Sequence, residues 1–263
     1  MANVAPPIPV KGTQPEGAHS EREASRKVRE MFTHIAPRYD LLNHLLSLDL
    51  DRLWRKRAAR RLQSILQHQN AMVLDLCCGT GDLALALARV GPASIVGADF
   101  SRAMLVRARE KSQRVPSQAG LTVPLPMAFF EADALRLPFA DRSFDLITNA
   151  FGFRNLANYE AGLCEMRRIL KPGGTVAILE FTEPPEGFLG NVYRWYLRSV
   201  LPRIGGFISG DSAAYNYLPK SVSRFFRPPE LARLMTAAGY HSVDFKVWTF
   251  GSVALHTAVR PPR

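Results

Sequence analysis

The sequence predicts an α/β fold built on a mainly parallel, seven-stranded sheet, and three observations support this. Short apolar runs alternate with helix-forming segments through residues 71–181, and the first run leads directly into a Gly79-x-Gly81 turn. Alternating strands and helices give parallel strands joined by right-handed crossovers. Two further apolar runs near the end of the chain are separated only by Thr249-Phe250-Gly251, so they are expected to form an antiparallel hairpin.

Three helices are expected before the sheet, at residues 21–35, 40–46 and 49–67. The first is rich in charged residues and is expected to end near Pro37, because proline cannot continue a helix. These N-terminal lid helices, which together span residues 21–67, are expected to pack against the sheet or to cover its opening.

The strands and the remaining helices then alternate along the chain. Strands are expected at 71–77, 94–99, 127–131, 144–150, 175–181, 242–248 and 252–259. Helices are expected at 82–90, 102–113, 158–170 and 229–238. Because the carboxyl ends of parallel strands meet at one edge of a sheet, ligands should bind at that edge.

The composition predicts one domain with a flexible start. Residues 1–20 are rich in Pro, Gly and Ala and lack the apolar core of a secretory signal, which indicates a disordered tail. Residues 21–263 are expected to form a single domain, with an insertion at 182–227 on the substrate side that carries aromatic and basic side chains. No stretch approaches the roughly 18 apolar residues of a membrane-spanning helix.

The three cysteines, Cys77, Cys78 and Cys164, form no CxxC pair and have no metal-ligand spacing. This pattern indicates a reducing compartment and gives no reason to expect a metal. The oligomeric state, including a homodimer, stays open.

The net charge of +11 is concentrated in one segment, residues 52–61, which holds six basic side chains with Leu53 and Trp54 between them. One interpretation is a solvated helix face above a buried apolar stripe. The other is a surface that attracts anionic lipid headgroups or RNA.

The glycine turn and the acid that follows it indicate an adenosine-binding half-fold. Gly79-x-Gly81-x-x-Ala84 is compatible with a dinucleotide, whose pyrophosphate would face the helix N-terminus. Asp75 and Asp82 flank the turn, however, and two acids suit the ammonium and sulfonium of S-adenosylmethionine better than a pyrophosphate. In either case Asp99, 18 residues after Gly81, could accept hydrogen bonds from ribose hydroxyls.

Further motifs are narrower. The segment 39–47 has the pattern Tyr-Asp-x-x-Asn-x-x-x-Ser, 151–155 reads Phe-Gly-Phe-Arg-Asn, and 168–175 contains Leu-Lys-Pro-Gly-Gly. Through these motifs the chain resembles the ubiquinone/menaquinone biosynthesis C-methyltransferases over roughly residues 28–260. Departures from the family include Ala150, where some members have Ser, and Asp51, where some have His.

This resemblance implies a Rossmann-like class I fold and S-adenosylmethionine as methyl donor, without a metal. The expected reaction converts demethylmenaquinol, a prenylated naphthoquinol, to menaquinol. The enzyme would be cytoplasmic and bound peripherally to the anionic inner face of the membrane, with no nucleic-acid partner. The equivalent methylation in ubiquinone biosynthesis, an RNA methyltransferase and a non-catalytic scaffold are the alternatives.

The resemblance also assigns roles to individual residues. The expected cofactor-binding residues are Asp75, Gly79, Thr80, Gly81, Asp99, Asp133 and Ala134, and the expected catalytic residues are Tyr39, Arg154 and Asn155. Several have a structural alternative. Thr80 could stabilise its turn, Asp99 could cap a helix, Asp133 could belong to a turn, and Arg154 could bind a carboxylate that fixes its loop.

Overall fold

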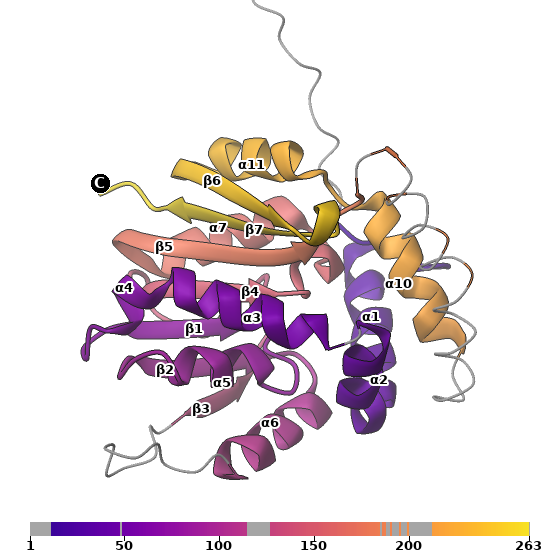
Figure 1. The fold of residues 1–263 in the computed structure, drawn as a ribbon, viewed down its shortest axis with the longest axis horizontal. Coiled ribbons are helices and arrows are strands. Elements are labelled where there is room, and N and C mark those ends of the chain that lie inside the picture. Colours follow the sequence, from indigo (N-terminus) through magenta and orange to yellow (C-terminus); the bar gives the residue numbers. More distant parts are fainter. Residues whose placement is uncertain are drawn as a thin grey trace, which may run out of the picture.

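The computed structural model describes residues 12–47, 49–114, 127–184, 186–187, 190, 195, 199 and 212–262. Its strands are β1 (Met72–Leu76), β2 (Ser94–Asp99), β3 (Ala128–Glu131), β4 (Phe144–Ala150), β5 (Leu170–Phe181), β6 (His241–Trp248) and β7 (Val253–Val259). These seven strands of the described chain form one sheet in the order β3-β2-β1-β4-β5-β7-β6 (Figure 1).

The strand directions confirm the predicted fold class. β1 to β5 pair in parallel, whereas β7 runs antiparallel to both β5 and β6. β5 begins at Leu170, five residues before the predicted start, because the Lys-Pro-Gly-Gly segment does not leave the sheet. The amide of Gly173 donates to Arg260 O at 3.0 Å, and the carbonyl of Gly174 accepts from Arg260 N at 2.8 Å.

The helices are α1 (Glu21–Ile35), α2 (Tyr39–Leu46), α3 (Leu50–Arg61), α4 (Gln63–Leu66), α5 (Asp82–Ala88), α6 (Arg102–Arg114), α7 (Tyr159–Ile169), α10 (Ser212–Arg224) and α11 (Pro228–Ala237), with a short 3-10 turn η1 (Ala36–Arg38) before α2. Polar caps fix two of the helix starts. Ser20 accepts from Glu23 N at the start of α1, and Asn158 accepts from Ala161 N at the start of α7. The helix predicted over 49–67 is interrupted at Leu62, where the backbone leaves the helical region.

Two apolar clusters cover the two faces of the sheet, as the alternation of side chains along a strand requires. On β1, Leu74 joins the cluster under α7 and α11, whereas Val73 joins the cluster under α3 and α5. Trp54 of α3 lies in the second cluster against Phe151 and donates its indole N–H to Thr249 Oγ1 at 2.8 Å.

Only part of the predicted lid covers the opening of the sheet. In Figure 1, α1, α2 and α10 gather at the end where β5 points, and α3 lies along a face of the sheet. The predicted lid therefore reduces to α1, η1 and α2, because the apolar stripe of α3 is buried on the sheet instead.

The predicted tail is shorter than residues 1–20. Thr13 is buried, its amide donates to Leu156 O at 2.7 Å, and its hydroxyl lies 2.7 Å from the hydroxyl of Tyr217 on α10. Gly12 passes so close to Ala157 that a Cβ would lie 2.0 Å from its carbonyl carbon. Residues 1–11 lie outside the described residues, as does much of the predicted insertion, including 200–211. No helix in the described ranges is long and apolar enough to cross a membrane.

Candidate active site

A cavity opens at the carboxyl ends of β1, β2 and β4, where the parallel topology predicts a ligand site. It encloses about 680 Å³ of empty space, including its mouth. α1 contributes Ser25 and Phe32 to its wall. Six of the residues predicted from the sequence also line it, namely Tyr39, Gly79, Asp99, Asp133, Ala134 and Asn155. The other four predicted residues, Asp75, Thr80, Gly81 and Arg154, lie behind this wall.

Two glycines allow close packing of the loops at and behind the floor of the cavity. Gly81 caps α5 with a φ of 85°, in the left-handed region, and a Cβ there would lie 3.1 Å from the Cβ of Ala108 on α6. At Gly152 a Cβ would lie only 2.5 Å from the Cβ of Cys77. The loop after β4 therefore lies directly against the glycine turn after β1.

Asp99 ends β2 with a carboxylate that is held from both sides. Its Oδ1 accepts from Ser101 N at 2.8 Å and its Oδ2 from Gly79 N at 2.9 Å. Burial raises the pKa of Asp99 to about 6, although these amide donors oppose the rise. The carboxylate thus binds the amide of Ser101, which precedes α6, and still borders the cavity, so this local contact and ribose binding are compatible.

Asp133 and Ala134 follow β3, the strand that pairs with β2 next to Asp99. The Oδ1 of Asp133 accepts from Leu135 N at 2.9 Å, which is the turn-type contact expected of an Asp after a strand. The residue is exposed, whereas Ala134 is buried, and both line the cavity. Their contact with adenine stays a prediction.

Arg154 is buried and paired with Glu180 of β5. Its Nη1 lies 2.7 Å from Glu180 Oε1 and donates to Phe151 O at 2.6 Å, and its backbone amide donates to Glu180 Oε2 at 3.1 Å. These contacts support the structural alternative, in which Arg154 fixes the loop after β4 to β5. A catalytic role for Arg154 stays a prediction.

Asn155, the next residue, faces the cavity with a fixed orientation. Its amide nitrogen donates to Phe151 O at 3.3 Å, and its Oδ1 accepts from the hydroxyl of Tyr217 at 3.0 Å. Tyr217 comes from α10, some 60 residues further along the chain, so the sequence offered no signal for this contact.

Tyr39 forms the lid side of the cavity. Its ring lies over the glycine turn, since a Cβ on Gly79 would be 3.8 Å from Tyr39 Cε1, and it meets Phe32 edge to face with centroids 6.0 Å apart. Burial raises the pKa of Tyr39 above its ordinary value, so the phenol stays protonated at neutral pH and can donate a hydrogen bond.

Asp75 and Thr80 are both buried next to the floor. The Oδ1 of Asp75 accepts from Thr148 Oγ1 at 2.8 Å, and burial raises the pKa of Asp75 to about 7. Its Oδ2 has no hydrogen-bond partner among the residues that the structure describes. The hydroxyl of Thr80 donates to Asp40 of α2 and accepts from Lys111 of α6. The sequence did not single out Lys111.

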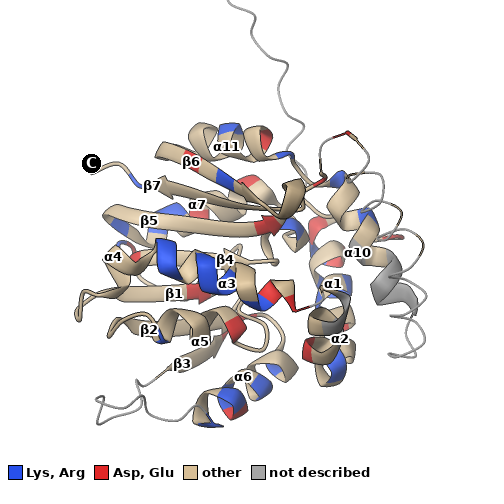
Figure 2. Ribbon diagram, viewed as in Figure 1, with Lys and Arg blue, Asp and Glu red and all other residues tan. Residues whose placement is uncertain are grey.

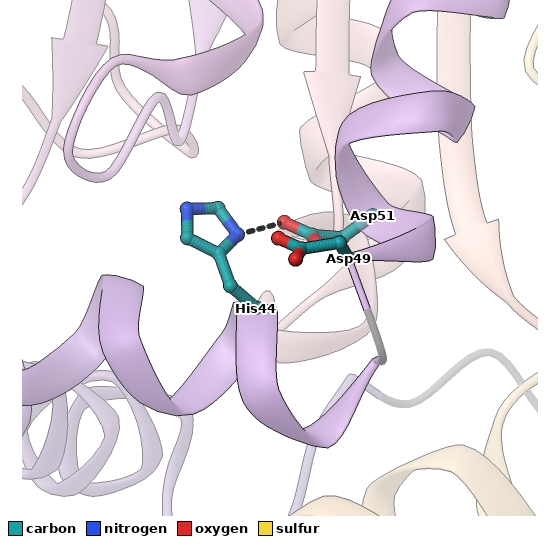
Figure 3. A group of neighbouring side chains, drawn as sticks. All are labelled: His44, Asp49 and Asp51. Carbon is teal, nitrogen blue, oxygen red and sulfur yellow. Dashed lines mark hydrogen bonds and ion pairs between the residues drawn. The ribbon is translucent and has the colours of Figure 1, made fainter.

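His44, Asp49 and Asp51 bring one ligand-type atom each within 4.8 Å of one another between α2 and α3 (Figure 3). His44 Nδ1 lies 2.8 Å from Asp51 Oδ2, and the guanidinium of Arg55 binds the same carboxylate. Because a cationic side chain already compensates Asp51, we interpret the group as an ion-pair network that joins the two helices.

Comparison with known proteins adds the family. Residues 20–260 match the ubiE/COQ5 methyltransferase family. The chain belongs to this family. A demethylmenaquinone methyltransferase from Thermus thermophilus is 50% identical over 232 residues, which are 88% of this chain and 100% of that protein. A ubiquinone/menaquinone biosynthesis C-methyltransferase from Geobacter sulfurreducens is 41% identical over 237 residues, 89% of each chain.

Solved structures agree on the fold. An S-adenosylmethionine-dependent methyltransferase from Thermotoga maritima matches with a TM-score of 0.62 at 20% identity, over 89% of this chain and 99% of that chain. The fold is that of class I S-adenosylmethionine-dependent methyltransferases, as predicted. Family and fold together confirm that this member of the ubiE/COQ5 family is an S-adenosylmethionine-dependent methyltransferase.

The side chains that line the cavity fit S-adenosylmethionine. A ribose needs an acceptor such as Asp99, which lines the cavity at the end of β2. The acids near the glycine turn have partners within the protein, because Asp40 and Asp82 bind Lys111 and Asp75 binds Thr148. Gly79 and Tyr39 both line the cavity, and the glycine lets the ring of Tyr39 lie close to the backbone of the turn.

Proposed function

We propose that this enzyme methylates a ring carbon of a prenylated quinol and converts demethylmenaquinol to menaquinol. The observation that carries the proposal is the 50% identity to a demethylmenaquinone methyltransferase that the chain covers from end to end. The cavity at the strand ends, with an acid on β2, an acid after β3 and an aromatic lid, supplies the groups that such a reaction needs.

The methyl donor supplies an activated methyl group on its sulfonium. The protein must therefore align the ring carbon with that group and favour the deprotonated, electron-rich form of the quinol. In the proposal, Asp99 accepts hydrogen bonds from the ribose hydroxyls, and Asp133 and the amide of Ala134 bind the adenine. Thr80, Gly81 and Asp75 support the turn next to the methionine portion.

Tyr39 and Asn155 contact the quinol in this proposal, because both line the cavity and both carry a hydrogen-bond donor. Their orientation is fixed, by Phe32 for the ring and by Tyr217 for the amide. Arg154 acts from behind Asn155. Its buried positive charge favours a developing oxyanion, and its pair with Glu180 holds the loop in place.

Ring methylation of a benzoquinol, as in ubiquinone biosynthesis, is the second candidate. The relative from Geobacter sulfurreducens, named for both quinones, favours it. An RNA methyltransferase has no such support among these relatives. A non-catalytic scaffold does not explain why acidic side chains line the cavity.

The prenyl tail of the substrate lies in a bilayer, so the proposal includes attachment to an anionic membrane surface. Supporting residues are on α3, where five basic side chains are exposed, namely Arg52, Lys56, Arg57, Arg60 and Arg61 (Figure 2). Leu53 is exposed between them, by 39%. Arg55, by contrast, is buried against Asp51 and does not contribute to this surface.

Quinone analysis of cells that lack this protein tests the substrate. Mass spectrometry should find a menaquinone precursor short of one methyl group, and the wild-type gene should restore the methylated form. Accumulation of a demethylated benzoquinone instead would favour the second candidate, and an unchanged quinone pool would contradict both.

A further inference from the structure

The side chain of Lys111 joins three parts of the molecule that border the cofactor turn. Its Nζ lies 2.7 Å from Asp40 Oδ2 on α2 and 2.5 Å from Asp82 Oδ1 on α5, and it donates to Thr80 Oγ1 at 2.9 Å. Lys111 itself belongs to the last turn of α6. One ammonium group therefore uses its three donors on groups from the lid, the turn and the first turn of the next helix.

Both carboxylates are paired with this cation, and Asp82 has a longer second contact of 3.9 Å with Arg55 Nη1. Asp40 and Asp82 both lie within 2.7 Å of the same nitrogen, so their negative charges face each other across it. All three side chains are largely buried, with exposures of 22–26%, and solvent screens their charges only in part. Without Lys111, repulsion between the carboxylates would push α2 away from the turn.

The position of α2 determines the lid wall of the cavity. Asp40 also accepts a hydrogen bond from Thr80, and its neighbour Tyr39 lies over Gly79. A second, weaker link runs from His44, whose Nε2 is 4.0 Å from Asp82 Oδ2. The first two turns of α2 thus contact the glycine turn at successive points, and Lys111 bonds to both sides.

We propose that Lys111 is a positioning residue for methyl transfer. It latches α2 onto the glycine turn and thereby holds Tyr39 in place as the wall against which the acceptor ring is aligned. Lys111 acts through Asp40 and Thr80, and it does not contact the reacting atoms. The effect on turnover rests on the proposed function, whereas the latch itself does not.

The latch can be tested in the ligand-free protein by hydrogen exchange. Lys111→Met should speed the exchange of amides in residues 39–46 at least tenfold and leave those of α7 unchanged. Arg114→Met, at an exposed position on the same helix, is the matched control and should change neither. Lys111→Arg, which keeps the charge, should restore most of the protection. If residues 39–46 are equally protected in folded Lys111→Met, the latch is wrong.

Kinetics then test the positioning role. Lys111→Met should lower kcat at least tenfold at saturating quinol, and Asp40→Asn should lower it similarly. The double variant should be little worse than either single variant, because both remove one interaction. Additive losses would overturn the proposal. If Lys111→Met fails to fold, Asp40→Asn carries the same test, because it removes the partner of Lys111 on α2. If the parent protein transfers no methyl group to the quinol but α2 exchanges faster in the variants, the proposed substrate is wrong and the latch is still supported.

Discussion

Arg154 and Glu180 form a buried ion pair, with Nη1 and Oε1 2.7 Å apart and side-chain exposures of 6% and 1%. The pair connects the loop after β4 to β5. The sheet therefore fixes the position of this loop, including Asn155 at the cavity wall. Removing one partner of such a pair leaves a buried charge uncompensated.

Glu180→Gln should therefore destabilise the fold by about 3–5 kcal/mol, the range for breaking a buried ion pair. Urea denaturation measures this, and Glu186→Gln, at an exposed position, is the control, with an expected change within about 0.5 kcal/mol. A loss below about 1 kcal/mol in Glu180→Gln would show that the pair is not needed to hold the loop.

Variants of the same ion pair distinguish a structural role of Arg154 from a catalytic one. Arg154→Lys keeps the charge but loses the planar fork. If Arg154 favours the oxyanion of the quinol, Arg154→Lys should lower kcat more than Glu180→Gln does, with cofactor affinity nearly unchanged in both. Equal kcat in the two variants, assayed where both are folded, would restrict Arg154 to the structural role.

Cofactor affinity should depend on pH through Asp99. Its pKa of about 6 lies above the unfolded value, so the carboxylate is ionised at pH 7.5 and becomes protonated as the pH falls through 6. Ribose hydroxyls donate best to the ionised form, so calorimetric titration should show weaker S-adenosylmethionine binding at pH 5 than at pH 7.5. Asp99→Ala should cost about 1.5–3 kcal/mol at pH 7.5. Unchanged affinity in folded Asp99→Ala would exclude the ribose contact.

Fold stability should depend on pH through Asp75. Burial raises its pKa to about 7, above the unfolded value of about 4. The native state then binds a proton that the unfolded chain releases, so the contribution of Asp75 is complete below pH 4 and is lost as the pH rises through 7. Asp75→Asn, which cannot ionise, should lose less thermal stability than the parent between pH 5 and pH 8. If the melting temperatures of the two proteins change with pH in parallel, the pKa of Asp75 lies in its ordinary range.

The basic face of α3 should bind anionic membranes. Each Lys or Arg near such a surface contributes about 1 kcal/mol, so reversing Lys56, Arg57, Arg60 and Arg61 to Glu should abolish co-sedimentation with anionic vesicles. The parent should bind little to zwitterionic vesicles and should be released at high salt. The control reverses Arg102, Arg114, Arg136 and Arg233, which are exposed elsewhere. Equal loss in both variants would mean that total charge, and not α3, determines binding. Equal binding of parent and α3 variant would make α3 a solvated face.

The sequence predicted most of the sheet because its strands are local apolar runs. Strands 94–99 and 144–150 were predicted with the bounds that β2 and β4 have. The start of β5 was not, since the contact of Gly173 and Gly174 with Arg260 joins residues far apart in sequence. The sequence also counted Arg55 among the six basic side chains of residues 52–61, whereas the fold buries it against Asp51 and Asp82.

The residues of the site also differ in how far the sequence could predict them. Asp99 and Gly79 follow from a strand, a turn and a helix within one segment, so the sequence could place them at the strand ends. The contacts of Tyr217 with Asn155 and of Lys111 with Asp40 join elements whose relative positions only the fold determines. No spacing rule relates such residues, which is why the sequence did not indicate them.

The most direct test of the account is methyl transfer by the purified protein. It should be incubated with S-adenosylmethionine and a short-tailed demethylmenaquinol under reducing conditions, and the quinone should then be analysed by mass spectrometry. The product should be heavier by one CH₂ group, carried on the ring and not on a hydroxyl, with S-adenosylhomocysteine formed in equal amount. An O-methylated product, or no product from folded protein that binds S-adenosylmethionine, would contradict it.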